Sequence, residues 1–535
     1  MSGWRFALSL SDAQVKAAQP PGTSKLIAHH HGGEDRLDDE LLLIPRPTKR
    51  AEDPLNWPMW RKCGALFALC FYVLVAEYAS AVPASVLPAM AYSTQPPTPF
   101  AKLTPIMAYN ALMIGVSNLF WVPLANAFGR RIILIISSLI MTMAGVWAAK
   151  ASSLESLFGA RAVQGIGMGP CFTLPATIIG EIFFLHQSGR AMAFYVTALA
   201  AGPLFGGITG GYIASGIDVT AVWWISTGLS AGTFCIVLLL VPESMFNRPA
   251  YTPAVNSSSG NDVHGSNDKE PSAEMIENYI PMAQSHPMPL TFWLALRRTT
   301  YQPGFLRELI RPIYTVRLPG VWVPTLQAAA LVAGIITMST VAPQLLALPP
   351  YSWHADVGLF NLGGVVALVL ALLTNYLVLD YMAKRQANVN SDGFVESESR
   401  LALCAPGLFL ATTGLLTFGL CAANPGGSAW VGLVVGNGML TFGLVTVPGI
   451  TYTYITDSYR SRSGDCFVIV GLVRAVIACV WTFYVGNWIE SAGPALTFGI
   501  FAIVLGVFSL LTIPLYFYGK RLRIATAKYL DQESH

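Results

Sequence analysis

The chain has 535 residues, of which 53% are hydrophobic and only 11% are charged, and its mean hydropathy is +0.53. Because an ordinary soluble domain carries roughly 25% charged residues, this composition excludes a soluble globular protein and indicates a chain that crosses a membrane several times. The formal net charge of +3, without a basic patch interleaved with aromatic residues, argues against nucleic acid as a partner.

The predicted elements begin with a polar tail. Residues 1–60 are polar and contain proline, so we expect a cytoplasmic N-terminal tail without a cleavable signal sequence. Beyond this tail, windows of about 20 apolar residues, the length that crosses the hydrocarbon core, predict twelve membrane spans. The spans are expected to begin near Cys63, Thr104, Ile132, Ser156, Met192, Val222, Gly320, Asp356, Leu401, Trp430, Gly464 and Leu496.

A polar insert divides these spans into two sets of six. The sets predict an N-terminal bundle over residues 61–243 and a C-terminal bundle over residues 318–519. The insert, residues 244–317, opens with a low-complexity run that cannot bury enough apolar surface to fold, so we expect a cytoplasmic linker that is partly disordered. Its later part, over residues 292–298 and 305–311, predicts short basic amphipathic helices on the membrane surface.

Lysine and arginine predict the orientation of the chain. With residues 520–535 as a second cytoplasmic tail, the basic residues that flank the spans fall on the cytoplasmic side, and only Lys102 and Lys150 fall outside. This distribution satisfies the positive-inside rule. We therefore expect an all-α membrane protein with twelve transmembrane helices and both ends in the cytoplasm.

Three segments of the first bundle have informative spacing. The turn after the second span, residues 124–131, contains a glycine followed by two arginines, and the fourth span begins with an arginine and three glycines over residues 161–169. The fifth span, around residues 201–211, is apolar and places glycines at helical spacing beside a proline. In a bilayer such small residues let another helix approach closely, and proline sets a bend, so this helix is typical of a transporter that moves.

These segments resemble signatures of the major facilitator superfamily, whose two six-helix halves alternate access around a site at the membrane midplane. The resemblance implies the major facilitator fold. It also implies gating and helix-packing roles for Asn126, Gly129, Arg130, Arg131, Gly202, Pro203, Gly206 and Gly207, and for Asp380, Lys384 and Arg385 in the corresponding turn of the second half.

One position departs from the first of these signatures. Asn126 stands where the signature has an acid, and Ala127 stands where it has a basic residue. The resemblance therefore implies a weakened charge clamp at the inward gate of this chain.

Four further segments resemble the fungal branch of twelve-span drug:proton antiporters. They are residues 53–58 before the first span, 241–248 after the sixth, 396–401 before the ninth and 456–459 at the end of the tenth. Members of that branch expel drugs, toxins and secondary metabolites, or move polyamines and related cations. The resemblance implies an efflux antiporter linked to multidrug resistance or secondary metabolite export, and a monomer.

Charged groups inside a membrane are costly and are usually functional. Glu77 lies in the middle of the first span, where apolar surroundings favour its neutral form, so we expect it to carry the coupling proton or to meet a cationic substrate. The alternative is a carboxyl that stays neutral or binds a neighbouring helix. Arg161 is expected to modulate Glu77 during coupling, and its alternative role is structural pairing with backbone carbonyls.

Polar residues in the other spans predict the substrate cavity. Arg474 is the cation of the second half and is expected either to contact a carboxylate or phosphate of the substrate or to pair with Asp457 or Asp465. The cavity is expected to contain Glu77, Gln327, Asn361, Asn437, Tyr452 and Arg474. For any one of these polar groups, a hydrogen bond between helices is the alternative.

The sequence therefore predicts a proton-coupled exporter of a small amphiphilic organic compound. Uptake or vacuolar transport of a polyamine-like cation or an organic acid is the first alternative, and a membrane sensor that transports nothing is the second. No nucleophile and base, phosphate-binding loop or cluster of Cys and His with metal-ligand spacing is visible, so we expect neither an enzyme nor a cofactor or metal site. The expected partners are substrate, protons and the lipid bilayer, in the plasma membrane or else in an internal membrane.

Overall fold

The structure is a computed structural model of the chain. It describes residues 53–93, 100–246, 305–353, 355–389, 394–395, 397–459 and 462–531, together with positions 9–10, 14–15, 24–25, 27–28, 40–41 and 48. The predicted amphipathic helix at 292–298 and most of the predicted linker lie outside these residues.

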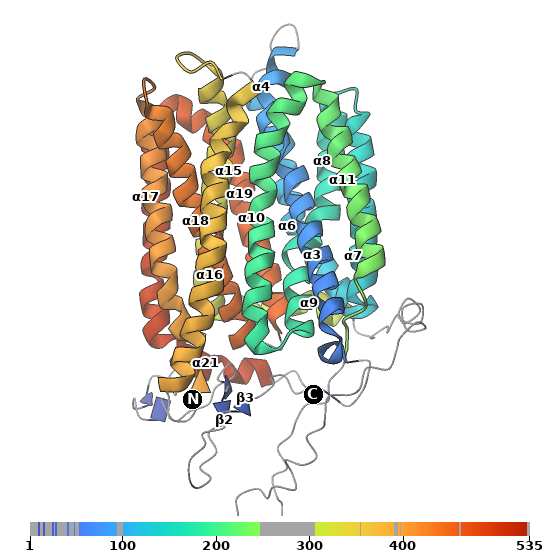
Figure 1. Ribbon diagram of the computed structural model, residues 1–535, viewed down its shortest axis with the longest axis vertical. Helices are drawn as coiled ribbons and strands as arrows, with labels where there is room; N and C mark the ends of the chain where they lie inside the picture. The colour runs from blue at the N-terminus through green and yellow to red at the C-terminus, as the bar shows by residue number, and fades with distance from the viewer. Residues whose placement is uncertain are drawn as a thin grey trace, which may run out of the picture.

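Twelve helices of the described chain are long and apolar enough to cross a membrane, which confirms the predicted number of spans. They stand side by side, and the start of α3 and the end of α21 lie at the same end of the bundle (Figure 1). The N-terminal half is built from α3 (Met59–Ala81), α4 (Pro83–Ser93), α6 (Pro105–Phe128), α7 (Arg130–Ala149), α8 (Leu154–Met168), η2 (Gly169–Phe172), α9 (Leu174–Ile182), α10 (Leu185–Gly216) and α11 (Val219–Leu240).

The C-terminal half repeats this arrangement. It is built from α15 (Pro319–Ala347), η3 (Ala355–Asn361), α16 (Leu362–Val389), η4 (Ser397–Leu403), α17 (Cys404–Ala423), α18 (Ala429–Ser458), α19 (Ser463–Ala492), α20 (Pro494–Leu510) and α21 (Thr512–Asp531). The last helix continues well beyond residue 519, where we had expected a tail to begin. The remaining elements are η1 (Pro54–Asn56), α5 (Phe100–Leu103), α14 (Phe305–Thr315), β1 (Ser24–Lys25), β2 (Ile27–Ala28), β3 (Glu40–Leu41) and β4 (Phe394–Val395), in which β1 pairs with β4 and β2 with β3.

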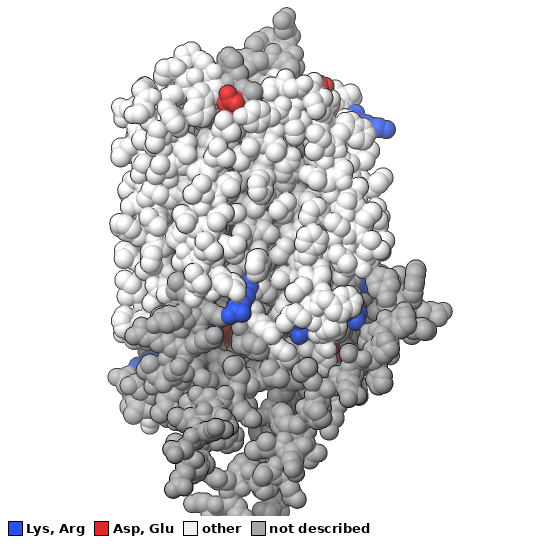
Figure 2. Space-filling model, in the orientation of Figure 1, with Lys and Arg blue, Asp and Glu red and all other residues white. Residues whose placement is uncertain are grey.

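The surface has the charge distribution of a membrane protein. On the face shown in Figure 2 the middle of the bundle is nearly free of charged side chains, and the Lys, Arg, Asp and Glu residues in view lie near its two ends. Large apolar side chains such as Phe67, Leu377 and Ile503 are exposed on the membrane-spanning helices α3, α16 and α20. Because water would penalise so much exposed apolar surface, this band is the part of the protein that lipid covers.

Glycines of α10 set the distance between α10 and its neighbours. A Cβ on Gly202 would lie 2.5 Å from Glu77 Cβ, and one on Gly206 would lie 3.0 Å from Tyr78 O, so these two glycines pack against α3. Gly207 points the other way, against Asn361 of the C-terminal half. One helix therefore uses two faces of small residues, one within its own half and one between the halves.

The two halves touch at both ends of the bundle. At the end of the bundle opposite the start of α3, Tyr212 donates a hydrogen bond to Asp356, and α4 packs against α15. Near the end where α3 begins, a Cβ on Gly180 would lie 3.5 Å from Thr456. Along the sides, α6 packs on α19 and α10 packs on α16. The structure is therefore a closed conformation.

The turn between α6 and α7 forms as expected. Gly129 has a φ of 102°, a left-handed conformation that glycine adopts without strain. The Glu243 carboxylate accepts hydrogen bonds from the backbone N–H groups of Arg130 and Arg131 at 3.0 and 3.1 Å and so neutralises the N-terminus of α7. The Arg131 side chain binds Leu238 O at 2.8 Å, which ties this turn to the end of α11.

The corresponding turn in the second half was predicted wrongly. Asp380, Lys384 and Arg385 lie inside α16, which continues to Val389, and their side chains are outside the described part of the structure. No glycine interrupts residues 380–385, and most of these residues are good helix formers, so the helix continues.

Buried ion pairs hold the corresponding end of the C-terminal half instead, where α21 ends. Glu398 and Arg523 form a two-point pair in which Nε and Oε1 are 2.6 Å apart. Arg400 pairs with Asp457 at 2.9 Å. These contacts tie η4 to α18 and α21.

Candidate functional site

Glu77 lies on the inner side of α3, beside the glycine face of α10. Its side chain is half-buried, yet its Oε1 is shielded from solvent and has no hydrogen-bond partner in the described residues. Gly202 makes room for it, because any side chain at that position would meet the Glu77 Cβ. An unpaired buried carboxyl oxygen costs about 1–3 kcal/mol, more if it is charged, so this position favours a proton on the carboxyl.

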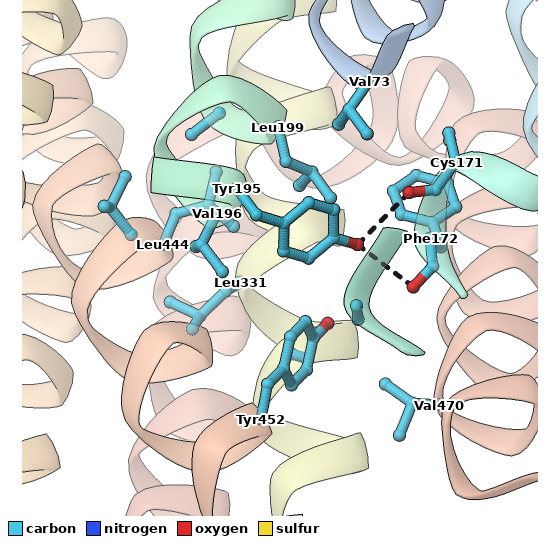
Figure 3. Close-up of a cluster of buried hydrophobic side chains, with 14 of the residues drawn as sticks. Val73, Cys171, Phe172, Tyr195, Val196, Leu199, Leu331, Leu444, Tyr452 and Val470 are labelled. Carbon is cyan, nitrogen blue, oxygen red and sulfur yellow. Dashed lines mark hydrogen bonds between the residues drawn. The ribbon is translucent and has the colours of Figure 1, made fainter. Parts of the chain in front are cut away.

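Titratable groups from both halves lie within electrostatic range of this carboxyl. Glu77 interacts electrostatically with Arg474, and both of them interact with Tyr195, Tyr452 and Cys171. Tyr195 of α10 and Tyr452 of α18 lie one above the other in Figure 3, among apolar side chains from several helices. The cluster therefore sits where the two halves meet, at the centre of the bundle.

The tyrosines of this cluster are fixed differently. Tyr195 is fully buried and donates to the backbone carbonyls of Cys171 and Phe172 at 3.2 and 3.1 Å, where the fourth span is interrupted by η2 (Figure 3). Those carbonyls are available because Pro170 and Pro175 break the helix there. Tyr452 packs edge-on against Phe467 with ring centroids 5.3 Å apart.

Arg474 spans the interface between the halves. Its guanidinium carbon lies 3.3 Å from the centroid of the Phe172 ring, so a cation of α19 rests on an aromatic ring of the N-terminal half. The side chain is 6% exposed and makes no hydrogen bond to the residues that the structure describes. The two acids that we considered as its partners are engaged elsewhere, Asp457 by Arg400 and Asp465 by Arg311.

Arg161 lies in a closed polar network within the N-terminal half. Its guanidinium donates to the carbonyls of Ala79 and Ser80 at 2.8 Å each and to Gln164 Oε1 at 2.7 Å. Asn110 donates to Arg161 O at 3.0 Å. Arg161 therefore binds the turn of α3 that follows Glu77, through backbone carbonyls, rather than the carboxyl itself.

Two further polar residues are buried without partners. Neither amide atom of Asn437 nor the hydroxyl of Thr441 finds a hydrogen bond among the described residues, and both side chains are at most 1% exposed. They lie one helical turn apart on α18, and both face Gly364 of α16, which also contacts Leu204 of α10. Polar groups are thus left unpaired at a second point between the halves.

The other predicted cavity residues bind neighbouring helices. Gln327 Nε2 donates to Phe508 O at 3.1 Å and to Thr512 Oγ1 at 2.6 Å, which joins α15 to the last span. Asn361 donates to Gly358 O at 3.2 Å and packs against Gly207. The structure therefore brings Glu77, Tyr452 and Arg474 together and places Gln327 and Asn361 in helix contacts.

Arg130 of the predicted gating turn lies at the end of the bundle where α7 begins. Arg130 pairs with Glu181 at 2.8 Å, and Ser244 donates to the other oxygen of that carboxylate at 2.7 Å. Arg190 lies 5.1 Å from the ring centroid of Tyr376, so this contact joins α10 to α16 across the halves.

Sequence reasoning missed Tyr195, Phe172 and Thr441. Tyr195 lies seven residues before Gly202, two helical turns away on the same face, so the glycine spacing already pointed to it. Thr441 follows Asn437 by four residues on the inner face of α18. Phe172 has no such signal, because its position depends on the break in the fourth span.

A cavity of about 250 Å³ lies elsewhere, between α15, α19 and α20. It is lined by apolar residues that include Ala330, Val476, Trp481 and Phe508. Without a titratable group in its wall, it offers no chemistry for coupling to protons.

Comparisons with known proteins agree with this architecture. The family model described as Major Facilitator Superfamily matches residues 69–482. The chain is 22% identical to Protein HOL1 of Saccharomyces cerevisiae over 92% of both chains, and 21% identical to the MFS antiporter QDR3 of Candida albicans over 89% of this chain and 80% of the relative. The crystal structure of the human organic anion transporter MFSD10 superposes with a TM-score of 0.54 at 14% identity and covers 84% of this chain and 99% of that one. At that identity the superposition supports the fold alone.

Proposed function

The chain belongs to the major facilitator superfamily, and we propose that it is a proton-coupled antiporter that exports a small amphiphilic organic compound by alternating access. The family is one of transporters, not enzymes, and the relative QDR3 is named as an antiporter. The observation that carries the proposal is the Glu77 carboxyl, which is buried at the centre of the bundle with one oxygen unpaired.

Glu77 is the proposed proton carrier. In the closed conformation the carboxyl lacks the hydrogen bonds and water that would stabilise its charge, so closure favours the protonated form. When the halves part, water can reach the carboxyl and stabilise the carboxylate, and the proton leaves. We assign Arg161 a positioning role in coupling, because it holds the turn of α3 that carries Ala79 and Ser80 just beyond Glu77.

The side chains at the seam, which is the interface between the two halves, are the proposed cargo contacts. Tyr452 and Arg474 lie beside Glu77, and Asn437 offers an unpaired donor and acceptor nearer the outer end of α18. Gln327 already binds the last span, and Asn361 binds Gly358 of its own element and packs against Gly207, so cargo could reach them only if those contacts broke. Apolar walls with a few polar groups suit an amphiphilic compound.

Transport of an organic acid is the second candidate. It is favoured by Arg474, a cation that carries no carboxylate partner in the described structure and that an acidic cargo would neutralise. In either case the proposed protein is a monomer of the plasma membrane, with an internal membrane as the alternative. Fluorescent tagging of the full chain and its migration in detergent test those two points.

Transport in proteoliposomes tests the proton coupling. The purified protein is reconstituted with a pH-sensitive dye in the lumen, and rhodamine 6G and benzoate serve as amphiphilic and acidic probe cargoes under an imposed pH gradient. The proposal expects movement of a probe against its gradient, with proton flux in the opposite direction. The Glu77→Gln variant is expected to lose this uphill movement, whereas Glu155→Gln, which alters an exposed carboxylate at the start of α8, retains it.

Three results would contradict the proposal. Unchanged uphill transport in Glu77→Gln would remove the carboxyl from the coupling step. Proton flux in the same direction as the probe would identify a symporter. A well-folded protein that moves neither probes nor protons would favour a sensor.

A further inference from the structure

Helix α14 lies between the two halves at the cytoplasmic end. It forms the last part of the predicted linker, and it packs against α6 of the N-terminal half and against α19 of the C-terminal half. Pro312 and Thr315 are buried in this contact, whereas Ile313 and Tyr314 on the opposite side are exposed. The helix therefore contacts both of the halves that must separate when the protein opens to the cytoplasm.

Helix α14 is fixed to the C-terminal half. A tight turn joins it to α15, in which Leu318 N donates to Thr315 O at 2.9 Å. The indole of Trp322, in the first turn of α15, donates to Val316 O at 2.8 Å. A second attachment comes from the side, where Arg311 Nε lies 3.2 Å from Asp465 Oδ2 in the first turn of α19.

The Asp465 carboxylate is well placed to hold Arg311 of α14 and to stabilise the N-terminus of α19. It is 5% exposed and lies in the first turn of α19, where a negative charge is stabilised by the helix dipole. Arg311 is only 31% exposed, so water does not fully screen the pair. Because α14 and α19 belong to the same half, this pair sets the angle at which α14 meets α6.

The last turn of α6 is where the chain departs from the superfamily signature. Asn126, in the last turn of α6, replaces the expected acid. One turn earlier on the same helix, Val122 lies 3.9 Å from the Cβ position of Gly464 at the start of α19. The end of α6 therefore meets the start of α19 without the charge that the signature would supply.

We propose that α14 is a latch that keeps the cytoplasmic gate closed, and that Arg311 and Asp465 are the positioning residues that hold it against α6. The latch compensates for the acid that is missing at position 126. When the C-terminal half tilts away during inward opening, α14 moves with it and its contact with α6 breaks. Loss of the Arg311–Asp465 pair loosens α14 and shifts the population toward the inward-open form.

A cysteine reporter at the gate tests this proposal. Thr456 lies against Gly180 across the closed gate and is only partly exposed, so Thr456→Cys is expected to become more accessible to a bulky reagent from the cytoplasm when the halves part. The background carries serine at the exposed positions Cys63 and Cys235. The rate of labelling by a bulky, membrane-impermeant maleimide is measured in inside-out vesicles, and the same background without the reporter is subtracted.

Arg311→Gln and Asp465→Asn are expected to raise the labelling rate about three- to tenfold each. The double variant is expected to match the single variants, because both act through one pair. The matched control is Arg317→Gln, which removes an exposed charge from the turn just after α14 and is expected to leave the rate unchanged. Size-exclusion profiles and melting temperatures verify that each variant is folded.

Two outcomes would overturn the latch. One is an unchanged labelling rate in folded Arg311→Gln, and the other is an equal increase in Arg317→Gln. Additive effects in the double variant would show that the two residues act separately. Since the assay needs neither cargo nor a proton gradient, its result is independent of the proposed proton coupling.

Discussion

Arg161 and Arg474 are both buried within membrane-spanning helices of the described chain, and their surroundings differ. Arg161 of the N-terminal half donates to three carbonyls and one amide oxygen, all within its own half. Arg474 of the C-terminal half makes no hydrogen bond to the described residues and rests on Phe172 of the other half. The first is a satisfied group that holds helices together, and the second is a group whose partners can change.

This contrast extends to the neutral polar residues. Asn110, beside Arg161, both donates and accepts a hydrogen bond, whereas Asn437 at the seam does neither within the described structure. Buried polar groups that stay unpaired cost free energy, so a fold retains them where another state or a ligand pairs them. The comparison teaches that the site of transport is found by unpaired groups between the halves rather than by buried charge alone.

The largest effect is expected when Arg161, the arginine held by hydrogen bonds, is replaced. Arg161→Leu removes four charge-assisted hydrogen bonds, each worth about 1.5–3 kcal/mol although not additive. We expect most of the protein to be lost as aggregate in fluorescence-detected size exclusion. Arg161→Lys keeps the charge and is expected to be intermediate. A normal profile and melting temperature for Arg161→Leu would refute the structural assignment.

An intermediate effect is expected when Arg474, the arginine without hydrogen bonds to the described residues, is replaced. Arg474→Gln loses one cation–π contact, worth about 0.5–2 kcal/mol, so the protein should fold with a melting temperature near that of the parent. Transport in proteoliposomes is expected to fall about ten- to a hundredfold, because a charged contact to the cargo or to Glu77 is lost. If Arg474→Gln unfolds as Arg161→Leu does, the distinction between the two arginines is wrong.

The smallest expected effect is a change in melting temperature, and its direction tests whether Asn437 is unpaired. Asn437→Leu replaces an unpaired amide with an apolar side chain of similar size, so we expect the melting temperature to rise by about 1–2 °C while transport weakens. The matched control is Asn375→Leu, which removes a hydrogen bond to Val445 O and should lower the melting temperature. Differential scanning fluorimetry measures both, and a fall in both variants would contradict the assignment of Asn437.

Much of the fold was predictable because a bilayer restricts the structures that a chain can adopt inside it. Apolar length predicted the twelve spans, and the turn at Gly129 could be read from one glycine between two helical runs. The prediction of a turn at residues 380–385 was wrong. It relied on the resemblance to the first half and gave too little weight to the local preference of Ala, Lys and Arg for helix.

The site was predictable only in part. Glu77 and Arg474 are visible in the sequence, because each is a charge in an apolar span. The sequence does not contain the distances between spans, so it could not pair Arg474 with Phe172 or assign Arg161 to the carbonyls of α3. Gln327 shows the same limit, since it faces the last span and not the seam.

The glycine face of α10 limits how this protein can diversify. Gly202 and Gly206 lie so close to α3 that any larger residue would push the helix away and move Glu77 with it. Changes in what the protein carries must therefore arise on the opposite wall, along α18 and α19, while this wall stays constant. Selection for a new cargo or a new inhibitor would be expected to leave its record on that C-terminal wall.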